Sequence, residues 1–329
     1  MQLAVWTQPY ADFASAADIA PLLDRLAGGG VNLLFPCVKS EVHFTGGRSL
    51  AYFNSELMDP GPLGDVLSPL CQQAHARGLA VHPWLCALLE GDSGFLREHP
   101  DAACCAFDNL NQGVRTGMAC PAHDETKAFL SALARELIDR YPIDGLHLDF
   151  IRYPGLRACA CPRCRQEMRR AIGAQPEDIF ASGEARRWWM DRRREHIGRL
   201  VELVAGIAHD EGRDLSAAVF CDYPRAADEV GQDWLDWCRR GLVDIVVPMN
   251  YKQRLSDFLA AAAQHRILLG DEAMVLEGIA KTTEAISLSA RELAAQVAGA
   301  VGVGCAGACI FAARSLTGED LAALRAGRE

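Results

Sequence analysis

The 329-residue sequence lacks the segments that would carry a chain into or across a membrane. Its start, MQLAVWTQPY, has neither a positively charged n-region nor an apolar h-region, and no later stretch approaches the length of a membrane span. No linker rich in Pro, Ser or Gly divides the sequence either. We therefore expect one cytoplasmic domain over residues 1–329, with no membrane partner.

Basic charge is also scarce. The formal net charge is −10, and the one dense run of arginines, RRWWMDRRREH at 186–196, contains Asp191 and Glu195. This pattern argues against nucleic acid as a partner. Half of the residues are hydrophobic, as is ordinary for a globular protein with a large core, and this composition excludes disorder.

Several catalytic signatures are missing. There is no G-x-S-x-G, which leaves a Ser/His/Asp hydrolase unsupported, and no H-x-H in the first apolar run, where a metal-dependent amidohydrolase barrel would carry one. The glycine-rich GGGVNLL precedes an apolar run instead of following it, so a dinucleotide-binding turn is not indicated.

What the sequence does have is an alternation of short apolar runs with helical stretches, repeated about eight times and without a run of antiparallel hairpins. This pattern predicts a single (β/α)₈ TIM barrel, and a doubly wound open sheet is the alternative. Long connections, at about 90–123 and 155–185, flank the fourth run. The apolar runs lie at residues 3–9, 31–38, 79–89, 144–151, 215–223, 243–251, within 267–278, and 305–313.

The fourth run ends in the strongest functional signal, Asp149. In a strand, His147 and Asp149 share one orientation, while Leu148 and Phe150 take the other. A carboxylate on the buried side, beside Arg152, is costly unless it is paired or has a function. It is either half of a structural Asp–Arg pair or part of an active site.

The segment that contains Asp149, GLHLDFIRYP, resembles the motif DG-h-H-h-D-Y-I-R-Y-P (h, hydrophobic) of a bacterial family of family-10-type glycosylhydrolase-like barrels. That family is related to enzymes acting on N-acetylglucosamine polymers and peptidoglycan glycan strands. WWMDRRREHIGRLV, VGQDWLDW, VPMNY and LEGIAKTT extend the resemblance over roughly residues 140–315. The first third matches loosely, chiefly in VHPW.

The resemblance implies a sugar-binding cleft with Asp149 as its acidic residue. Glycoside hydrolysis needs two carboxyl groups. Asp222, at the end of the fifth run, is the nearest candidate for the second, although it is equally a helix cap or turn residue before Tyr223. Glu277, which ends the seventh run, is the other candidate for the second catalytic carboxyl group, but it lies where the family pattern usually has Pro.

Aromatic and polar residues at the strand ends are candidates for binding sugar. Aromatic rings would stack on pyranose faces, an amide would bond hydroxyl groups, histidines would orient Asp149, and a guanidinium would hold its charge. The predicted substrate-binding residues are Trp6, His82, Trp84, His147, Arg152, Tyr153, Asn250 and Tyr251.

Thirteen cysteines, an odd and scattered set, indicate buried free thiols instead of a disulfide framework. Cys159, Cys161 and Cys164 have the C-x-C-x-x-C spacing of zinc ligands, or could form a disulfide in an oxidising compartment. A zinc ion there would hold the loop in place without taking part in catalysis, because a site closed by thiolates leaves no open position for water. We expect that catalysis requires no cofactor. The fourth ligand would be Cys104, Cys105, Cys120 or His123.

Three functions follow in order of support: a glycoside hydrolase acting on a polysaccharide or oligosaccharide, a non-catalytic carbohydrate-binding barrel, and a zinc-dependent hydrolase. Two carboxyl groups roughly 5–10 Å apart across the bowl would favour hydrolysis. A metal in the bowl with an open coordination position would favour the third function.

Overall fold

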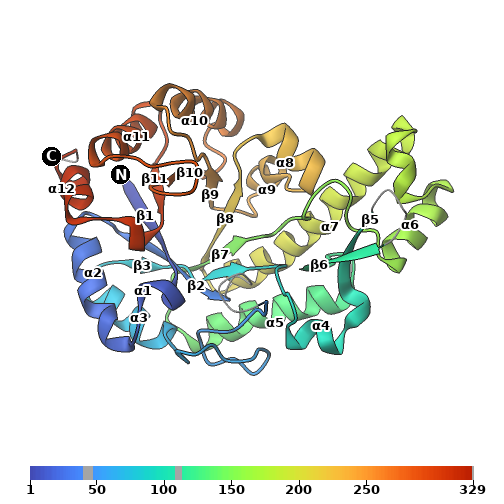
Figure 1. Cartoon of the computed structure of the whole chain (residues 1–329), viewed down its shortest axis with the longest axis horizontal. Helices are drawn as coiled ribbons and strands as arrows, with labels where there is room; N and C mark the ends of the chain where they lie inside the picture. Colours follow the sequence, from blue (N-terminus) through green and yellow to red (C-terminus); the bar gives the residue numbers. More distant parts are fainter. Residues whose placement is uncertain (40–46, 108–112, 328–329) are drawn as a thin grey trace.

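The computed structural model describes residues 1–39, 47–107 and 113–327, and its centre is a closed parallel barrel (Figure 1). β1 pairs with both β2 and β11, which closes the sheet, so the predicted TIM-barrel fold is confirmed. β3 and β4 share the third of the eight strand positions, because both pair with β2. The barrel strands are β1 (Gln2–Thr7), β2 (Leu33–Lys39), β3 (Ala80–Val81), β4 (Trp84–Cys86), β7 (Gly145–Asp149), β8 (Asp214–Phe220), β9 (Ile245–Met249), β10 (Met274–Ala280) and β11 (Gly307–Phe311).

Helices surround the barrel and cover its outer face (Figure 1). The strands they cover are almost continuously buried, as expected for parallel strands packed on both sides. In the described residues, no helix is both long and apolar enough to cross a bilayer. The helices are α1 (Pro9–Asp12), α2 (Ile19–Gly28), α3 (Leu67–His75), α4 (Gly94–Glu98), α5 (Asp124–Arg140), α6 (Pro162–Ile172), α7 (Gly183–Asp210), α8 (Tyr223–Val230), α9 (Trp234–Arg239), α10 (Leu255–Leu269), α11 (Ala290–Gly302) and α12 (Gly318–Ala326).

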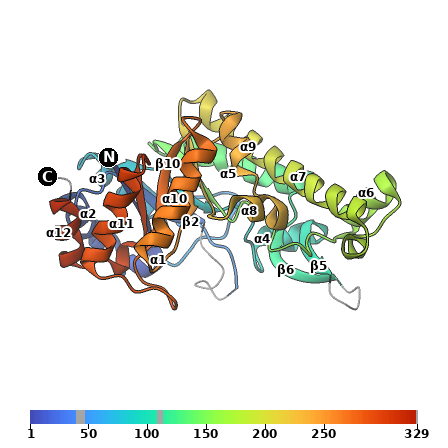
Figure 2. The same cartoon turned by 90° about the horizontal axis from the view of Figure 1, so that it is seen from above.

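The two long connections beside the fourth barrel strand, β7, form a projection on one side of the barrel (Figures 1 and 2). The connection before β7 contains an antiparallel hairpin, β5 (Ala103–Phe107) and β6 (Gly113–Ala119). The connection after it contains α6 and leads into the 28-residue α7. This single hairpin is not the run of antiparallel hairpins that the sequence argued against, but it was not itself predicted, because β5 and β6 consist largely of small residues that show no strand periodicity.

The barrel interior is filled by aromatic rings and a small polar network. His147 accepts a hydrogen bond from the Trp6 indole at Nε2 (3.0 Å) and stacks on Phe35 at 3.9 Å between ring centroids. Its Nδ1 bonds Ser216 Oγ at 2.9 Å, and His82 Nδ1 bonds the same oxygen at 3.1 Å. Both histidines were predicted to orient Asp149, but these bonds place them in the core layer below it.

Burial keeps the two rings uncharged. It lowers the pKa of His82 to about 4 and that of His147 well below its usual range. Since Nε2 of a neutral His147 accepts from Trp6, Nδ1 carries the proton and donates to Ser216 Oγ. The Ser216 hydroxyl in turn donates to the Leu146 carbonyl at 3.0 Å. One serine oxygen therefore satisfies the donors of two buried rings.

We predict that Ser216→Ala lowers the free energy of unfolding by about 1–3 kcal/mol, because it leaves two buried N–H donors without an acceptor. Urea unfolding followed by tryptophan fluorescence measures the loss. Ser256→Ala, which changes an exposed serine in the first turn of α10, is the matched control. A loss no larger than the control's would show that this network contributes nothing to stability.

Candidate active site

A pocket of about 290 Å³ lies at the mouth of the barrel, where the strands end. The C-terminal face is where TIM barrels place their active sites. Four residues predicted from the sequence meet in it: Asp149 and the three aromatics Trp6, Trp84 and Tyr251. The full lining is Trp6, Gln8, Trp84, Asp149, Phe150, Met249, Tyr251 and Phe311.

Asp149 is the last residue of β7, and its side chain is held by the turn that follows. Its Oδ1 accepts a hydrogen bond from the Phe150 amide at 2.6 Å, and its carbonyl accepts one from the Ala87 amide at 2.7 Å. Phe150 has a φ of 50°, a left-handed conformation that is strained for a bulky residue. This turn breaks the strand alternation, so Phe150 joins Asp149 in the pocket instead of facing away from it.

Aromatic rings form the walls around Asp149. The Trp6 and Trp84 rings meet edge to face at 6.5 Å, and Tyr251 stacks on Phe311 at 6.1 Å. Flat apolar faces of this kind match the C–H-rich faces of a pyranose ring. Burial, together with the nearby negative charge of Asp149, raises the pKa of Tyr251 well above its usual range. Its phenol therefore stays protonated and can donate a hydrogen bond.

Two polar atoms of the pocket residues are free to bind a ligand. The Trp84 Nε1 donor and the Gln8 Oε1 acceptor are buried and have no hydrogen-bond partner among the described residues. A sugar hydroxyl is both a donor and an acceptor, so it fits either atom. The Gln8 backbone is held by Asp12, whose Oδ2 accepts from the Gln8 amide at 2.6 Å.

Glu277 and Asn250, both predicted for the site, lie outside this pocket. Glu277 is fully buried between β10 and α10, where its carboxylate bonds His265 Nδ1 at 2.8 Å and Asn250 Nδ2 at 3.0 Å. The Asn250 amide also donates to the Phe258 carbonyl at 2.9 Å. Both side chains are thus engaged in linking β9 and β10 to α10.

Asp222, Arg152 and Tyr153 are not among the pocket residues either. Asp222 is exposed at the N-terminus of α8, where its side chain caps no amide. The Arg152 guanidinium covers the Phe220 ring at 4.6 Å. Tyr153 is buried, with its hydroxyl 3.1 Å from His196 Nδ1 of α7. These two side chains therefore tie the segment after β7 to β8 and α7.

Phe150, Met249 and Phe311 line the pocket but were not predicted, whereas Gln8 is a polar residue at the end of the first apolar run, where the sequence places the bowl. Met249 and Phe311 end β9 and β11, so their positions at strand ends were a usable signal. The sequence offers no comparable signal for Phe150, because only its backbone conformation turns the ring inward.

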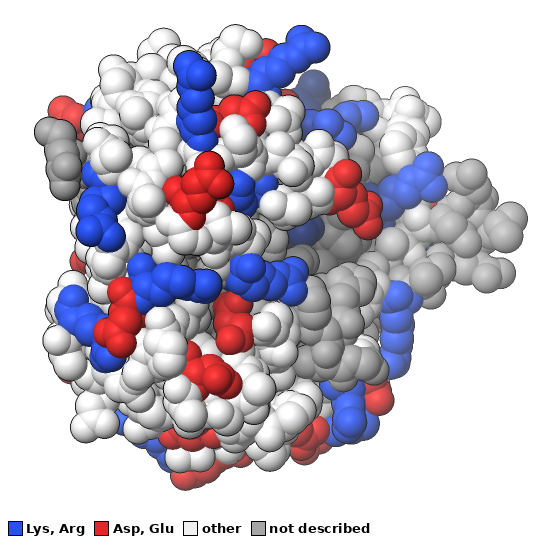
Figure 3. Space-filling view, turned by 60° about the vertical axis from the view of Figure 1, so that its left-hand side comes forward, with Lys and Arg blue, Asp and Glu red and all other residues white. Residues whose placement is uncertain are grey.

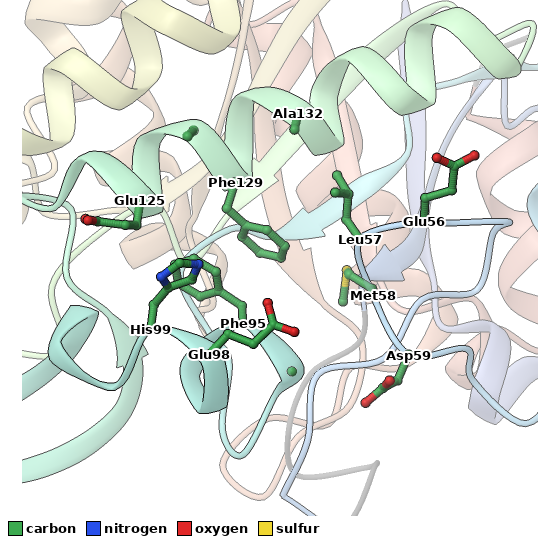
Figure 4. A pocket seen from close by; sticks show the side chains of 12 residues that line it. Glu56, Leu57, Met58, Asp59, Phe95, Glu98, His99, Glu125, Phe129 and Ala132 are labelled. Atoms are coloured by element: carbon green, nitrogen blue, oxygen red, sulfur yellow. The ribbon is translucent and has the colours of Figure 1, made fainter.

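A second cavity, of about 570 Å³, lies between α4, α5 and residues 56–59 (Figure 4). Phe95 and Phe129 stack at 4.4 Å on its wall, with Glu98 and Glu125 nearby. It is lined by helix and loop residues and includes no strand end, so it is separate from the barrel mouth. On the face drawn in Figure 3, acidic and basic side chains are interspersed.

Comparisons with known proteins bear on the family and on the fold. The family model described as "Glycosyl hydrolase-like 10" matches residues 10–274. No curated protein matches the sequence. Among solved structures, the PgaB (BpsB) glycoside hydrolase domain from Bordetella bronchiseptica is similar with a TM-score of 0.75 at 14% identity, covering 100% of this chain and 97% of that one.

Two larger enzymes share the same fold over part of their length. The alpha-L-fucosidase isoenzyme 2 from Paenibacillus thiaminolyticus has a TM-score of 0.71 at 15% identity, covering 100% of this chain and 49% of that one. The beta-galactosidase from Rahnella sp. R3 has a TM-score of 0.71 at 12% identity, with 100% and 55% covered. At such identities the likeness concerns the fold alone.

We predict that the Glu277–His265 pair makes stability depend on pH. Burial lowers the pKa of His265, but its hydrogen bonds to Cys221 and Glu277 outweigh this and raise it to about 10, from an ordinary 6.5. A raised histidine pKa contributes stability that is complete below about 6.5 and lost as the pH rises through about 10. The free energies of unfolding of the wild type and of His265→Gln, measured in urea, should therefore become more alike as the pH rises towards about 10.

The matched control is His209→Gln, which breaks an exposed pair with Asp244 (2.9 Å) that solvent screens. Its difference from the wild type should stay small across the same pH range. A His265→Gln difference that is equally flat would contradict the assignment of a charged buried pair.

Proposed function

Because the chain belongs to the glycosyl hydrolase-like 10 family, we propose that it is a glycoside hydrolase that cleaves a polysaccharide or oligosaccharide at the mouth of its barrel. The observation that carries the proposal is the pocket in which Asp149 is surrounded by Trp6, Trp84 and Tyr251. A carboxyl group between aromatic walls supplies one of the two carboxyl groups that a glycosidase needs, together with a surface that can bind sugar.

In this proposal Asp149 supplies one of the two carboxyl groups. As an acid, it would give its proton to the glycosidic oxygen while the bond from the anomeric carbon to that oxygen breaks. As a nucleophile, it would attack the anomeric carbon and form a glycosyl-enzyme that water then hydrolyses. The protonated phenol of Tyr251 would donate a hydrogen bond to a sugar oxygen beside it.

Asp222 is the proposed partner. It follows β8, the strand next to β7, and its exposure leaves it accessible to a substrate that extends beyond the pocket. Glu277 is not used in the proposal, since its carboxylate is already bonded to His265 and Asn250 on the outer side of the barrel.

One observation favours the second function, a non-catalytic carbohydrate-binding barrel. Among the described residues that line the pocket, Asp149 is the single carboxylate. The zinc-dependent hydrolase is not favoured, because none of the clustered cysteines lines this pocket.

We expect Asp149→Asn to reduce hydrolysis of β-1,4- or β-1,6-linked glucosamine and N-acetylglucosamine oligosaccharides by about 10²–10⁴-fold while leaving the fold intact. Reducing-end assays and circular dichroism measure the two effects. If Asp149 is the acid, the rate of hydrolysis of an aryl glycoside with a good leaving group should fall much less, because its leaving oxygen needs no proton. If Asp149 is the nucleophile, Asp149→Asn should slow the hydrolysis of both substrates equally.

Asp236→Asn, which changes an exposed carboxylate of α9, is the control for the loss of one charge. Hydrolysis that survives in folded Asp149→Asn would overturn the assignment. Sugar binding without turnover in the wild type would favour the carbohydrate-binding barrel.

The unpartnered indole N–H of Trp84 provides a separate test of binding. Trp84→Phe keeps a ring in the wall but removes the donor, and we expect the Kd of a bound oligosaccharide to rise roughly fivefold, which corresponds to about 1 kcal/mol. Isothermal titration calorimetry measures the change. Trp237→Phe is the matched control, because Trp237 Nε1 is also buried without a partner but lies in α9, away from the pocket. Equal effects in both variants would argue against a sugar contact at Trp84.

A further inference from the structure

We propose that Cys120, Cys159, Cys161 and Cys164 bind a structural Zn²⁺ ion that ties the segment after β7 to the β5–β6 hairpin. The four Sγ atoms lie within 4.8 Å of one another, and all four side chains are buried. They come from two places in the chain, since Cys120 directly follows β6 and the other three lie between β7 and the first turn of α6. This site does not depend on the proposed glycosidase activity.

The spacing of the sulfur atoms fits a tetrahedral zinc site. A Zn–S bond of about 2.3 Å places the sulfurs of a tetrahedron about 3.8 Å apart. Cys120 Sγ lies 3.6 Å from Cys164 Sγ and 3.9 Å from Cys161 Sγ. A disulfide requires about 2.0 Å and joins only two sulfurs, so it accounts neither for these separations nor for the convergence of four thiols.

The surroundings favour thiolates, the form in which cysteine binds zinc. The amides of Cys105 and Cys161 each donate to Cys159 Sγ at 3.4 Å. Cys161 is the N-cap of the 11-residue α6 and Cys164 lies in its first turn, where the helix dipole stabilises negative charge. The buried guanidinium of Arg193 lines the same small cavity as Cys159 and Cys164, and it offsets the net charge of a zinc tetrathiolate.

The arrangement also selects the fourth ligand among the candidates that the sequence left open. Neither Cys104 nor Cys105 belongs to the cluster of four, and Cys105 Sγ donates to the Ala103 carbonyl at 3.6 Å. His123 Nε2 lies 3.5 Å from Cys161 Sγ, which suits a hydrogen bond to a ligand sulfur. Cys120 is therefore the fourth ligand.

Four cysteines around one ion leave no open position for water or substrate, so the ion is structural. Between β7 and α6 the chain runs without a helix or strand, and this stretch contains Phe150 of the pocket wall. Zinc would fix the far end of this stretch, while Arg193 Nη2 holds its middle through the Gly155 carbonyl at 2.6 Å.

The test is the metal content of the full chain, purified without added metal and measured by inductively coupled plasma mass spectrometry. We expect about one zinc per chain in the wild type and in Cys105→Ser, the matched control from the same hairpin, and almost none in Cys161→Ser. Cobalt-exchanged wild type should show the intense thiolate-to-metal absorption of a tetrahedral sulfur site, and Cys161→Ser should lose it. Removing zinc with a chelator should lower the unfolding temperature of the wild type.

Wild-type chain without zinc, and without that absorption after cobalt is added, would overturn the proposal. So would iron in place of zinc, or a disulfide between two of the four cysteines, detected as two thiols missing from the denatured, unreduced chain. If Cys161→Ser fails to fold, the zinc content and the cobalt spectrum of the wild type and of Cys105→Ser still decide. Zinc retained in a folded Cys161→Ser would contradict this ligand set.

Discussion

The pairing of β1 with both β2 and β11 is the constraint on which the rest of the structure depends. Closure points the C-terminal ends of all the parallel strands at one mouth, so residues far apart in sequence meet there whatever lies between them. It also creates an interior that side chains must fill. Trp6, Phe35 and His147 fill it, and Ser216 satisfies the polar atoms that come with the histidine rings. The pocket is the space above this layer.

Closure also gives the outward-facing and inward-facing side chains of the strands different surroundings. Residues of β10 that point outward meet α10, and there Glu277 has a histidine and an amide as partners. Inside the barrel the histidines are neutral because burial lowers their pKa. The carboxylate at the end of β7 is thus the acidic group that the pocket presents to a ligand. This division follows from strand alternation on a sheet that is covered on both sides.

Much of the fold could be predicted from sequence because the parallel strands are continuous apolar runs between helical stretches. Asp149 stood out because it ends one of those runs. The orientation of Glu277 could not be predicted, since both faces of its strand are apolar and the pattern does not tell inside from outside. The position of Phe150 in the pocket could not be predicted for another reason: its positive φ reverses the alternation of side chains on which the prediction relied. Cys120 was one of four equivalent candidates until the chain brought its sulfur beside the others.

The cysteine cluster also bears on how the chain can change during evolution. Cys120 directly follows β6, and Cys164 lies in the first turn of α6, before the rest of that helix and the segment that leads into α7. The sulfur positions must stay fixed if they hold an ion, but the far end of α6 lies outside that constraint. Insertions and deletions there would reshape the projection beside the pocket without moving the strand ends. An ion at this position would fix the part of the projection nearest the barrel and leave the far end of α6 free to vary.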